Sequence, residues 1–423
     1  MRRRFIDTRI FKSFFSLSAV QVINSAIPLL VTPYVIRQVG VERFGHVALA
    51  QTIVLLLTAV TDYGFYFSAT RDISRVRDDT RALGGIVSTV LTAKALLCGG
   101  CLLLMTGVVL VVPDFRAEYP LYLLSAPLLL GQAFLPVWFF HGVERMRTLV
   151  FLNLFGKVIF VALIPLVNQP DDYVYVNFFQ GVGSLLAVVP ALAIIHRRHR
   201  VRLRLSSLRA VRRELVDNAL LFASSFSVYA SAHTPLIVLS FFAGDYLVGI
   251  YSVAEKVYFI LRTLVAMVHQ AVYPKACQLA QTSVAPLMGF FRRLMKPVAA
   301  GYLLGYGLLF VMADDVVRFF AGKAFPTSAD LLRALALAPF CLLLSMPGSH
   351  TLLAFDLKQT YARVMVAGAL FSLGAGLLAI PAFRAWGTVW VVVTTEALTM
   401  LLTYVLLGRR HKAYFATRQL FRP

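Results

Sequence analysis

Charged residues are scarce in this chain, and acidic residues are the scarcest of them. Of the 423 residues, 14% are charged and 59% are hydrophobic, and 20 Asp and Glu stand against 41 Lys and Arg. A soluble domain is about half apolar and about a quarter charged. The composition therefore makes a lipid bilayer the first solvent to consider. The formal net charge of +21 needs to be explained by position before a nucleic-acid partner is inferred.

Cysteines and cofactor motifs are also few. The four cysteines lie in or beside apolar runs, so no disulfide framework is expected. Cys98 and Cys101 have C-x-x-C spacing, but they lie inside an apolar helix with no strand before it, which favours packing over redox chemistry. The sequence contains no G-x-x-x-x-G-K-[ST] and no H-E-x-x-H. These absences exclude a primary ATPase, and neither a metal nor another cofactor is expected.

Long apolar runs dominate what is present. A membrane-spanning helix needs about 20 mostly apolar residues, and twelve runs meet this requirement. The loops between them are short and leave no room for a soluble catalytic domain, so an enzyme is not expected. The first run is too long for the core of a signal peptide and is predicted to be retained. The predicted spans are residues 14–36, 46–69, 83–112, 119–140, 148–167, 174–195, 215–241, 248–272, 294–313, 329–354, 362–382 and 387–407.

The Lys and Arg residues alternate between dense and sparse loops. With the N-terminus inside, the inner segments hold 30 of them, the outer loops 6 and the spans 5. This asymmetry follows the positive-inside rule and predicts that both termini are cytoplasmic. It accounts for the net charge without a nucleic-acid partner. Residues 196–214 are predicted to be a basic cytoplasmic linker that contacts anionic headgroups, between an N-terminal lobe (1–195) and a C-terminal lobe (215–423).

Two segments 204 residues apart resemble each other. GVERFGHVALAQ (40–51) and GDYLVGIYSVAE (244–255) both have glycines five apart and an alanine five beyond the second glycine. Because six spans per lobe is an even number, duplicated lobes insert in the same orientation. We therefore expect an all-α integral membrane protein. Its twelve transmembrane helices would form two pseudo-symmetric six-helix bundles, with a path between them.

The stretch GIYSVAEKVYFILRTLVAMVHQ carries titratable groups along a membrane-length segment. Glu255, Arg262 and His269 are seven apart and share one helical face, and Lys256 lies one position round. An ionised group at mid-bilayer is costly unless it is paired or faces water. This polar sector is predicted to line a cavity or the seam between the lobes. The alternative is that a Glu255–Arg262 or Asp62–Lys pair holds helices together.

Other ionisable residues within the spans are mainly cationic. Lys94 lies in the middle of the third span and Lys157 in the middle of the fifth. Snorkelling to the interface explains lysines near helix ends, but it explains Lys94 poorly. The acidic residues within spans are Asp62, Glu255 and Glu396, which are candidate ion-coupling groups. The cationic balance favours an anionic passenger, such as a phosphate-bearing lipid headgroup.

Three further polar or aromatic positions have two interpretations each. Gln21 and Asn24 share one face of the first span, which suits either sugar hydroxyls or a partner helix. Trp138 is expected in the interfacial aromatic belt rather than as a platform for a sugar. Glu396, in VTTEALT, either carries a proton or cation or packs among threonines of the last span.

The stretches IRQVGVERFGHVALAQ, TDYGFYFSATRDIS and GIYSVAEKVYFILRTLVAMVHQAVYP resemble the polysaccharide and O-antigen flippases of the multidrug/oligosaccharidyl-lipid/polysaccharide (MOP) exporter superfamily. The similarity extends over nearly the whole chain. It implies translocation of an undecaprenyl-pyrophosphate-linked oligosaccharide across the bacterial inner membrane as two lobes rock. The implied partners are this lipid-linked oligosaccharide, membrane lipids and polysaccharide assembly proteins such as a polymerase or chain-length regulator.

The resemblance also implies a cationic cavity. The residues that match this role are Lys94, Lys157, Lys256 and Arg262, which would bind the pyrophosphate. Three other functions stay open. A drug or cation antiporter of the same superfamily should have an excess of acids within its spans. A membrane glycan polymerase or ligase should carry a sizeable extracytoplasmic loop. A scaffold in a polysaccharide assembly complex would be supported by a mutant that assembles but does not transport.

Overall fold

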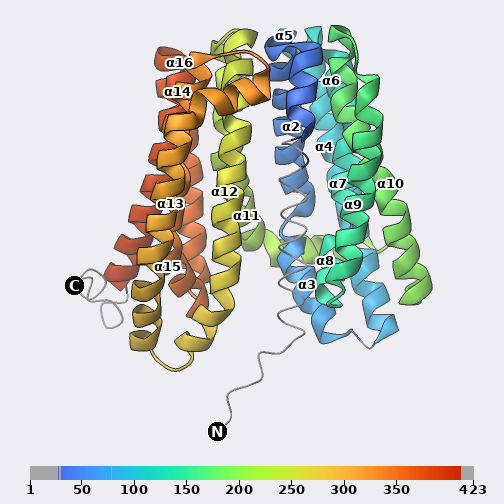
Figure 1. The fold of residues 1–423 in the computed structure, drawn as a ribbon. Helices are drawn as coiled ribbons and strands as arrows, with labels where there is room; N and C mark the ends of the chain where they lie inside the picture. The colour runs from blue at the N-terminus through green and yellow to red at the C-terminus, as the bar shows by residue number, and fades with distance from the viewer. Residues whose placement is uncertain (1–26, 28–29, 78, 411–423) are drawn as a thin grey trace. The chain divides into compact units, whose positions relative to one another are not determined.

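The chain is helical almost throughout. The computed structural model describes residues 27, 30–77 and 79–410, and no strand occurs among them. The chain divides into two compact units, with the boundary between Tyr229 and Ala230. Figure 1 shows the helices of both units. Most of the first predicted span, including Gln21 and Asn24, lies outside the described residues.

Nine helical segments of the described chain are long and apolar enough to cross a membrane. A further long helix, α12 (Asp245–Ala280), has 36 residues. It carries the charged face formed by Glu255, Lys256, Arg262 and His269. The final helix, α16 (Lys358–Arg410), contains two predicted spans, because Arg384 leaves helical geometry with φ 50°. The nine segments are residues 41–75, 80–111, 119–142, 146–166, 170–198, 208–242, 284–321, 326–354 and 358–409. The prediction of an all-helical membrane protein is confirmed.

The first unit contains the helices from α2 to α10 and the first part of α11 (Leu208–Phe242). Its fourth predicted span is three short helices, because prolines interrupt it. Pro120 and Pro127 each begin a helix, and Pro136 precedes another. The elements are α2 (Val41–Asp62), α3 (Phe65–Arg75), α4 (Thr80–Val111), α5 (Pro113–Ala117), α6 (Tyr119–Leu124), α7 (Ala126–Phe134), α8 (Val137–Gly142), α9 (Met146–Leu163), η1 (Ile164–Leu166), η2 (Pro170–Val174) and α10 (Tyr175–Arg198).

The second predicted span, 46–69, is broken between α2 and α3. Tyr63 and Gly64 both have left-handed backbone, with φ of 46° and 78°. A Cβ on Gly64 would lie 2.9 Å from the Cβ of Leu221, so α11 packs directly against the break. The Tyr63 ring also stacks on Phe222 of α11, with ring centroids 4.3 Å apart. The break is therefore packed against α11, and Gly64 allows this close approach because it has no side chain.

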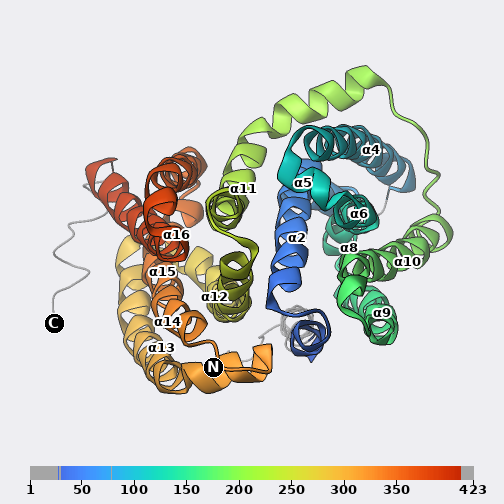
Figure 2. The ribbon, with the colours of Figure 1, turned by 90° about the horizontal axis from the view of Figure 1, so that it is seen from above.

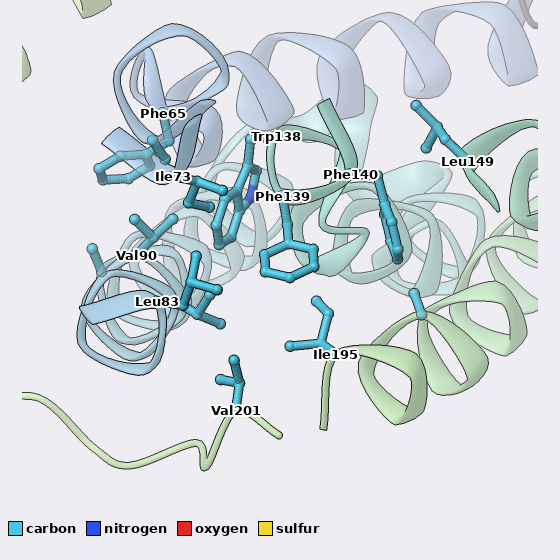
Figure 3. Close-up of a cluster of buried hydrophobic side chains, with 14 of the residues drawn as sticks. Phe65, Ile73, Leu83, Val90, Trp138, Phe139, Phe140, Leu149, Ile195 and Val201 are labelled. Atoms are coloured by element: carbon cyan, nitrogen blue, oxygen red, sulfur yellow. The ribbon is translucent and has the colours of Figure 1, made fainter. Parts of the chain in front are cut away.

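A hydrophobic core closes the first unit beside the break. Figure 3 shows Phe65, Ile73 and Leu83 facing the aromatic side chains of α8. Trp138 belongs to this core and is 1% exposed. Its predicted place in an interfacial aromatic belt is therefore wrong. The reason is that Pro136 begins a short helix that turns three consecutive aromatic residues inward.

The predicted linker, 196–214, is tied to the first unit. Its non-helical part is residues 199–207, because α10 continues to Arg198 and α11 begins at Leu208. The backbone N–H of Arg204 donates to Ser88 Oγ at 3.1 Å, and that of Ser206 donates to Thr92 Oγ1 at 3.2 Å. Alternate backbone amides of the linker are thus satisfied by hydroxyls one turn apart on α4.

The second unit contains the rest of α11, then α12, α13 (Val284–Ala321), α14 (Pro326–Leu335), α15 (Ala338–Ala354) and α16. Within it α15 packs against both α12 and α16, as the view in Figure 2 shows. The repeated glycine motifs occupy matching places in the two units. Gly40 is the N-cap of α2 and Gly244 is the N-cap of α12. Ala50 and Ala254, which follow them, are both fully buried.

Candidate functional site

Lys94 and Asp62 form a buried ion pair in the first unit. The Nζ atom of Lys94 lies 3.0 Å from Oδ1 of Asp62. The Lys94 side chain is 3% exposed and that of Asp62 is 33% exposed. A molecule that approaches this pair therefore meets the carboxylate first. The predicted alternative, in which Asp62 pairs with a lysine of another helix, is the observed arrangement.

The surroundings of Asp62 are polar although they lie within a spanning segment. Thr58, one turn earlier on α2, has its hydroxyl oxygen 2.8 Å from the Val54 carbonyl and 3.1 Å from Gln132 Oε1 of α7. Tyr66 and Tyr229 lie close enough for their hydroxyls to interact electrostatically with the Asp62 carboxylate. Asp62 thus contacts the Lys94 ammonium and interacts with the hydroxyls of two tyrosines.

Arg262 forms the corresponding ion pair in the second unit. Its Nη1 donates to the Tyr258 hydroxyl at 2.8 Å and to the carboxylate of Glu396 on α16. The side chains of Arg262 and Glu396 are 19% and 14% exposed. The partner of Arg262 in the described chain is therefore Glu396, 134 residues away, rather than Glu255 on the same helix.

The rest of the charged face of α12 also packs inside the second unit. Glu255 is 3% exposed, and the neighbouring Lys256 is half-buried. His269 Nε2 lies 3.3 Å from the carbonyl oxygen of Leu342 on α15, and its ring is 5.0 Å from that of His350. Arg262 therefore contacts α16 and His269 contacts α15, and the predicted lining of a cavity or seam by this face stays a prediction.

Lys157 has a different environment from the other predicted cations. It is half-buried on α9 and has no ion-pair partner in the part of the chain that the structure describes. Phe151 and Phe155, on the same helix, are exposed and stacked. The adjacent Gly156 allows close contact with α10, because a Cβ there would lie 2.7 Å from the Gly183 carbonyl oxygen. Lys157 therefore lies beside a tight helix crossing, and no acidic side chain of the described residues pairs with it.

Sequence reasoning missed several polar partners. Tyr258 is one turn before Arg262, so the helical spacing could have identified it. His350 gave only an isolated histidine in an apolar run, and its contact with His269 depends on how α12 and α15 pack. Cys98 and Cys101 are free thiols, and no cluster of three or more potential metal ligands occurs among the described residues.

Comparisons with known proteins identify the family. A family model described as "Polysaccharide biosynthesis protein" matches residues 10–279, which is more than half of the chain. A protein of Escherichia coli (strain K12) named "Putative O-antigen transporter" is 27% identical over 399 residues, covering 92% of this chain and 94% of its own length. A protein of Shigella dysenteriae with the same name is 26% identical and covers 92% of this chain and 98% of its own length.

Solved structures show the same fold at low identity. A structure titled "Lipid II flippase MurJ, inward closed conformation" has a TM-score of 0.73 and 11% identity, covering 92% of this chain and 87% of its own. An inward-facing multidrug resistance MATE family transporter of the MOP superfamily has a TM-score of 0.68 and 14% identity, covering 95% and 98%. The predicted architecture is thus confirmed. The chain belongs to the polysaccharide biosynthesis protein family and has the fold of the MOP superfamily.

Proposed function

We propose that this chain is a flippase for an undecaprenyl-pyrophosphate-linked oligosaccharide, such as an O-antigen or exopolysaccharide repeat unit. It would act in the bacterial inner membrane by alternating access, with both termini in the cytoplasm. The observation that carries the proposal is the match over nearly the full length to proteins named as O-antigen transporters. Relatives named as transporters also favour transport over catalysis.

The charges within the spans support an anionic headgroup as the transported anchor. We assign pyrophosphate binding to Lys157, Lys256, Arg262 and Lys94. Arg262 fits this role because a guanidinium binds phosphate oxygens through several donors at once. Its pairing with Glu396 keeps the charge compensated until an anion takes the place of that carboxylate. Lys94 is the weakest of the four, because the more exposed Asp62 covers it.

The remaining predicted roles are proposals on the same footing. Gln21 and Asn24 would contact the glycan from the first span. Asp62, Glu255 and Glu396 would couple transport to an ion gradient, unless consumption of the glycan on the far side supplies the energy. Glu255 is the most deeply buried of the three. An ionised carboxylate is costly to bury, so Glu255 is the acid that would gain most from binding a proton.

The test is complementation of a flippase-null strain with single variants of the four cations. The variants that should each reduce surface glycan are Lys94→Gln, Lys157→Gln, Lys256→Gln and Arg262→Gln. Lys157→Arg should retain more than Lys157→Gln. The double variant Arg262→Gln/Glu396→Gln separates the loss of the cation from the effect of an unpaired carboxylate. Wild-type surface glycan from all the variants at normal protein levels would remove the proposed site.

A further inference from the structure

The end of α2 lies well inside a membrane-spanning segment. Residues 41–75 are one segment long and apolar enough to cross a membrane, yet α2 stops at Asp62 and α3 starts at Phe65. The last four carbonyl groups of a helix have no partner within it, and the aligned peptide dipoles make this end electronegative. Asp62 adds a full negative charge at the same place. The last turn of α2 has no basic residue of its own.

The packing of α11 holds the break between α2 and α3 in place. Gly64 has a φ of 78°, and any side chain there would collide with Leu221. Tyr63 is stacked face to face on Phe222. The break therefore cannot close into a continuous helix without displacing α11. Broken helices of this kind use their exposed carbonyl oxygens to bind cations in other membrane transporters.

The cation at this helix end comes from the chain itself. Lys94 reaches Asp62 from α4, and an ammonium has three donors for oxygen acceptors. Its neighbours on α4 are apolar and buried: Val90 is 1% exposed, Ala93 is 0% exposed and Cys98 is 1% exposed. A buried ammonium is tolerated only where opposite charge and acceptors are already in place. The site thus has the negative charge that a free monovalent cation needs, and one oxygen ligand that is already in contact with an ammonium.

We propose that the broken end of α2 is a monovalent-cation site and that the tethered ammonium of Lys94 occupies it in place of a free ion. The ligands would be the Asp62 carboxylate, which Lys94 contacts, and carbonyl oxygens of the last turn of α2 other than that of Ala59, which already accepts the Tyr63 N–H. Because Lys94 already matches the charge, the first unit needs no bound alkali ion at this place. This goes beyond the proposed function, since it holds whatever cargo the chain carries.

The proposal is tested with the purified full-length protein in detergent, without any glycan lipid. The thermal unfolding midpoint is measured at pH 8 and constant ionic strength in sodium, potassium, methylammonium or choline chloride. The wild type should give one midpoint in all four salts. Lys94→Met should be less stable in choline and should regain stability saturably with at least one of the three smaller cations. Lys94→Met/Asp62→Asn should lose this response.

Two controls separate a cation site from a general salt effect. Lys157→Met also removes an ammonium within a span, but from a position with no ion-pair partner in the described chain, so it should show no preference among the salts. Lys94→Arg keeps a tethered cation and should behave as the wild type. If Lys94→Met does not fold, Lys94→Gln is titrated instead. Equal midpoints for the folded Lys94 variant in all four salts, or the same cation response in Lys157→Met, would overturn the proposal. Neither result depends on whether the chain is a flippase.

Discussion

The two units each have a buried ion pair on the helix that follows the glycine motif, but the pairs have opposite polarity. In the first unit α2 contributes the acid, Asp62, and in the second unit α12 contributes the base, Arg262. The Asp62 side chain is far more exposed than that of its partner Lys94, at 33% against 3%. Arg262 and Glu396 are nearly equal, at 19% and 14%. The first pair therefore presents a carboxylate, and the second presents both charges.

The backbones of α2 and α12 also differ at the two ion pairs. α2 ends at its ion pair, whereas α12 runs through Arg262 without interruption for 36 residues. A broken helix offers carbonyl oxygens, which suit a cation, and a continuous helix offers only its side chains. Two segments that share a sequence motif thus have different chemistry about two to three turns further along. The exposed carboxylate of the first pair suits a cation, whereas the guanidinium of the second pair can also meet an anion.

The largest expected effect comes from removing one acid from each pair. Glu396→Gln leaves Arg262 charged and buried, because a guanidinium does not lose its proton, and should cost about 3–5 kcal/mol of stability. Asp62→Asn should cost less, about 1–3 kcal/mol, because Asp62 is 33% exposed and water can replace part of its interaction. Thermal unfolding of both variants in detergent measures the order.

The double variants Arg262→Gln/Glu396→Gln and Lys94→Met/Asp62→Asn are the controls for this pair of substitutions. Each should recover part of the stability lost in the single variant, since no charge is left unpaired. The contrast between the units fails if Asp62→Asn proves as destabilising as Glu396→Gln.

The sequence was sufficient for the spans but not for the partners of their charges. Span length and the Lys and Arg asymmetry depend on local composition, so the segments could be read directly. The partner of Lys94 is 32 residues away and that of Arg262 is 134 residues away, on helices whose contacts the sequence does not encode locally. Residue spacing favoured Glu255 as the partner of Arg262, because spacing identifies only partners on the same helix. Trp138 was misplaced for a similar reason, since the turn at Pro136 decides where it points.

The second expected effect concerns the break in α2. Gly64→Ala should cost about 1–2 kcal/mol for the left-handed backbone and about 1–3 kcal/mol for overpacking against Leu221. Gly305→Ala is the matched control in the second unit, because no atom lies within 4 Å of its added Cβ. Alanine is the better helix former by about 1 kcal/mol, so Gly305→Ala should leave the unfolding midpoint unchanged or raise it. Equal losses in the two variants would show that the break is not held by packing.

A smaller effect on stability, but a larger one on transport, is expected from reversing the first pair. Asp62→Lys combined with Lys94→Glu keeps opposite charges in contact, so it should lower the unfolding midpoint less than Asp62→Asn does. It also places a cation at the exposed position and makes the first unit resemble the second. Surface glycan in a flippase-null strain should fall to the level of the empty vector. Retained transport at normal protein levels would mean that the polarity of this pair has no part in the function.

The smallest expected effect concerns the linker, which only the first unit carries. Arg209 and Arg212 are exposed on α11, beside Leu205 and Leu208, which are 93% and 71% exposed. Basic and apolar side chains together fit the anionic surface of a membrane, where each Arg contributes about 1 kcal/mol. Arg209→Gln/Arg212→Gln should therefore lower the unfolding midpoint in nanodiscs that contain phosphatidylglycerol, and much less in phosphatidylcholine alone. Lys323→Gln, an exposed change in the second unit, should show no such dependence on lipid. The linker variant could instead lose the same stability in both lipids. Its arginines would then act through contacts within the protein, and the linker would not bind anionic lipid.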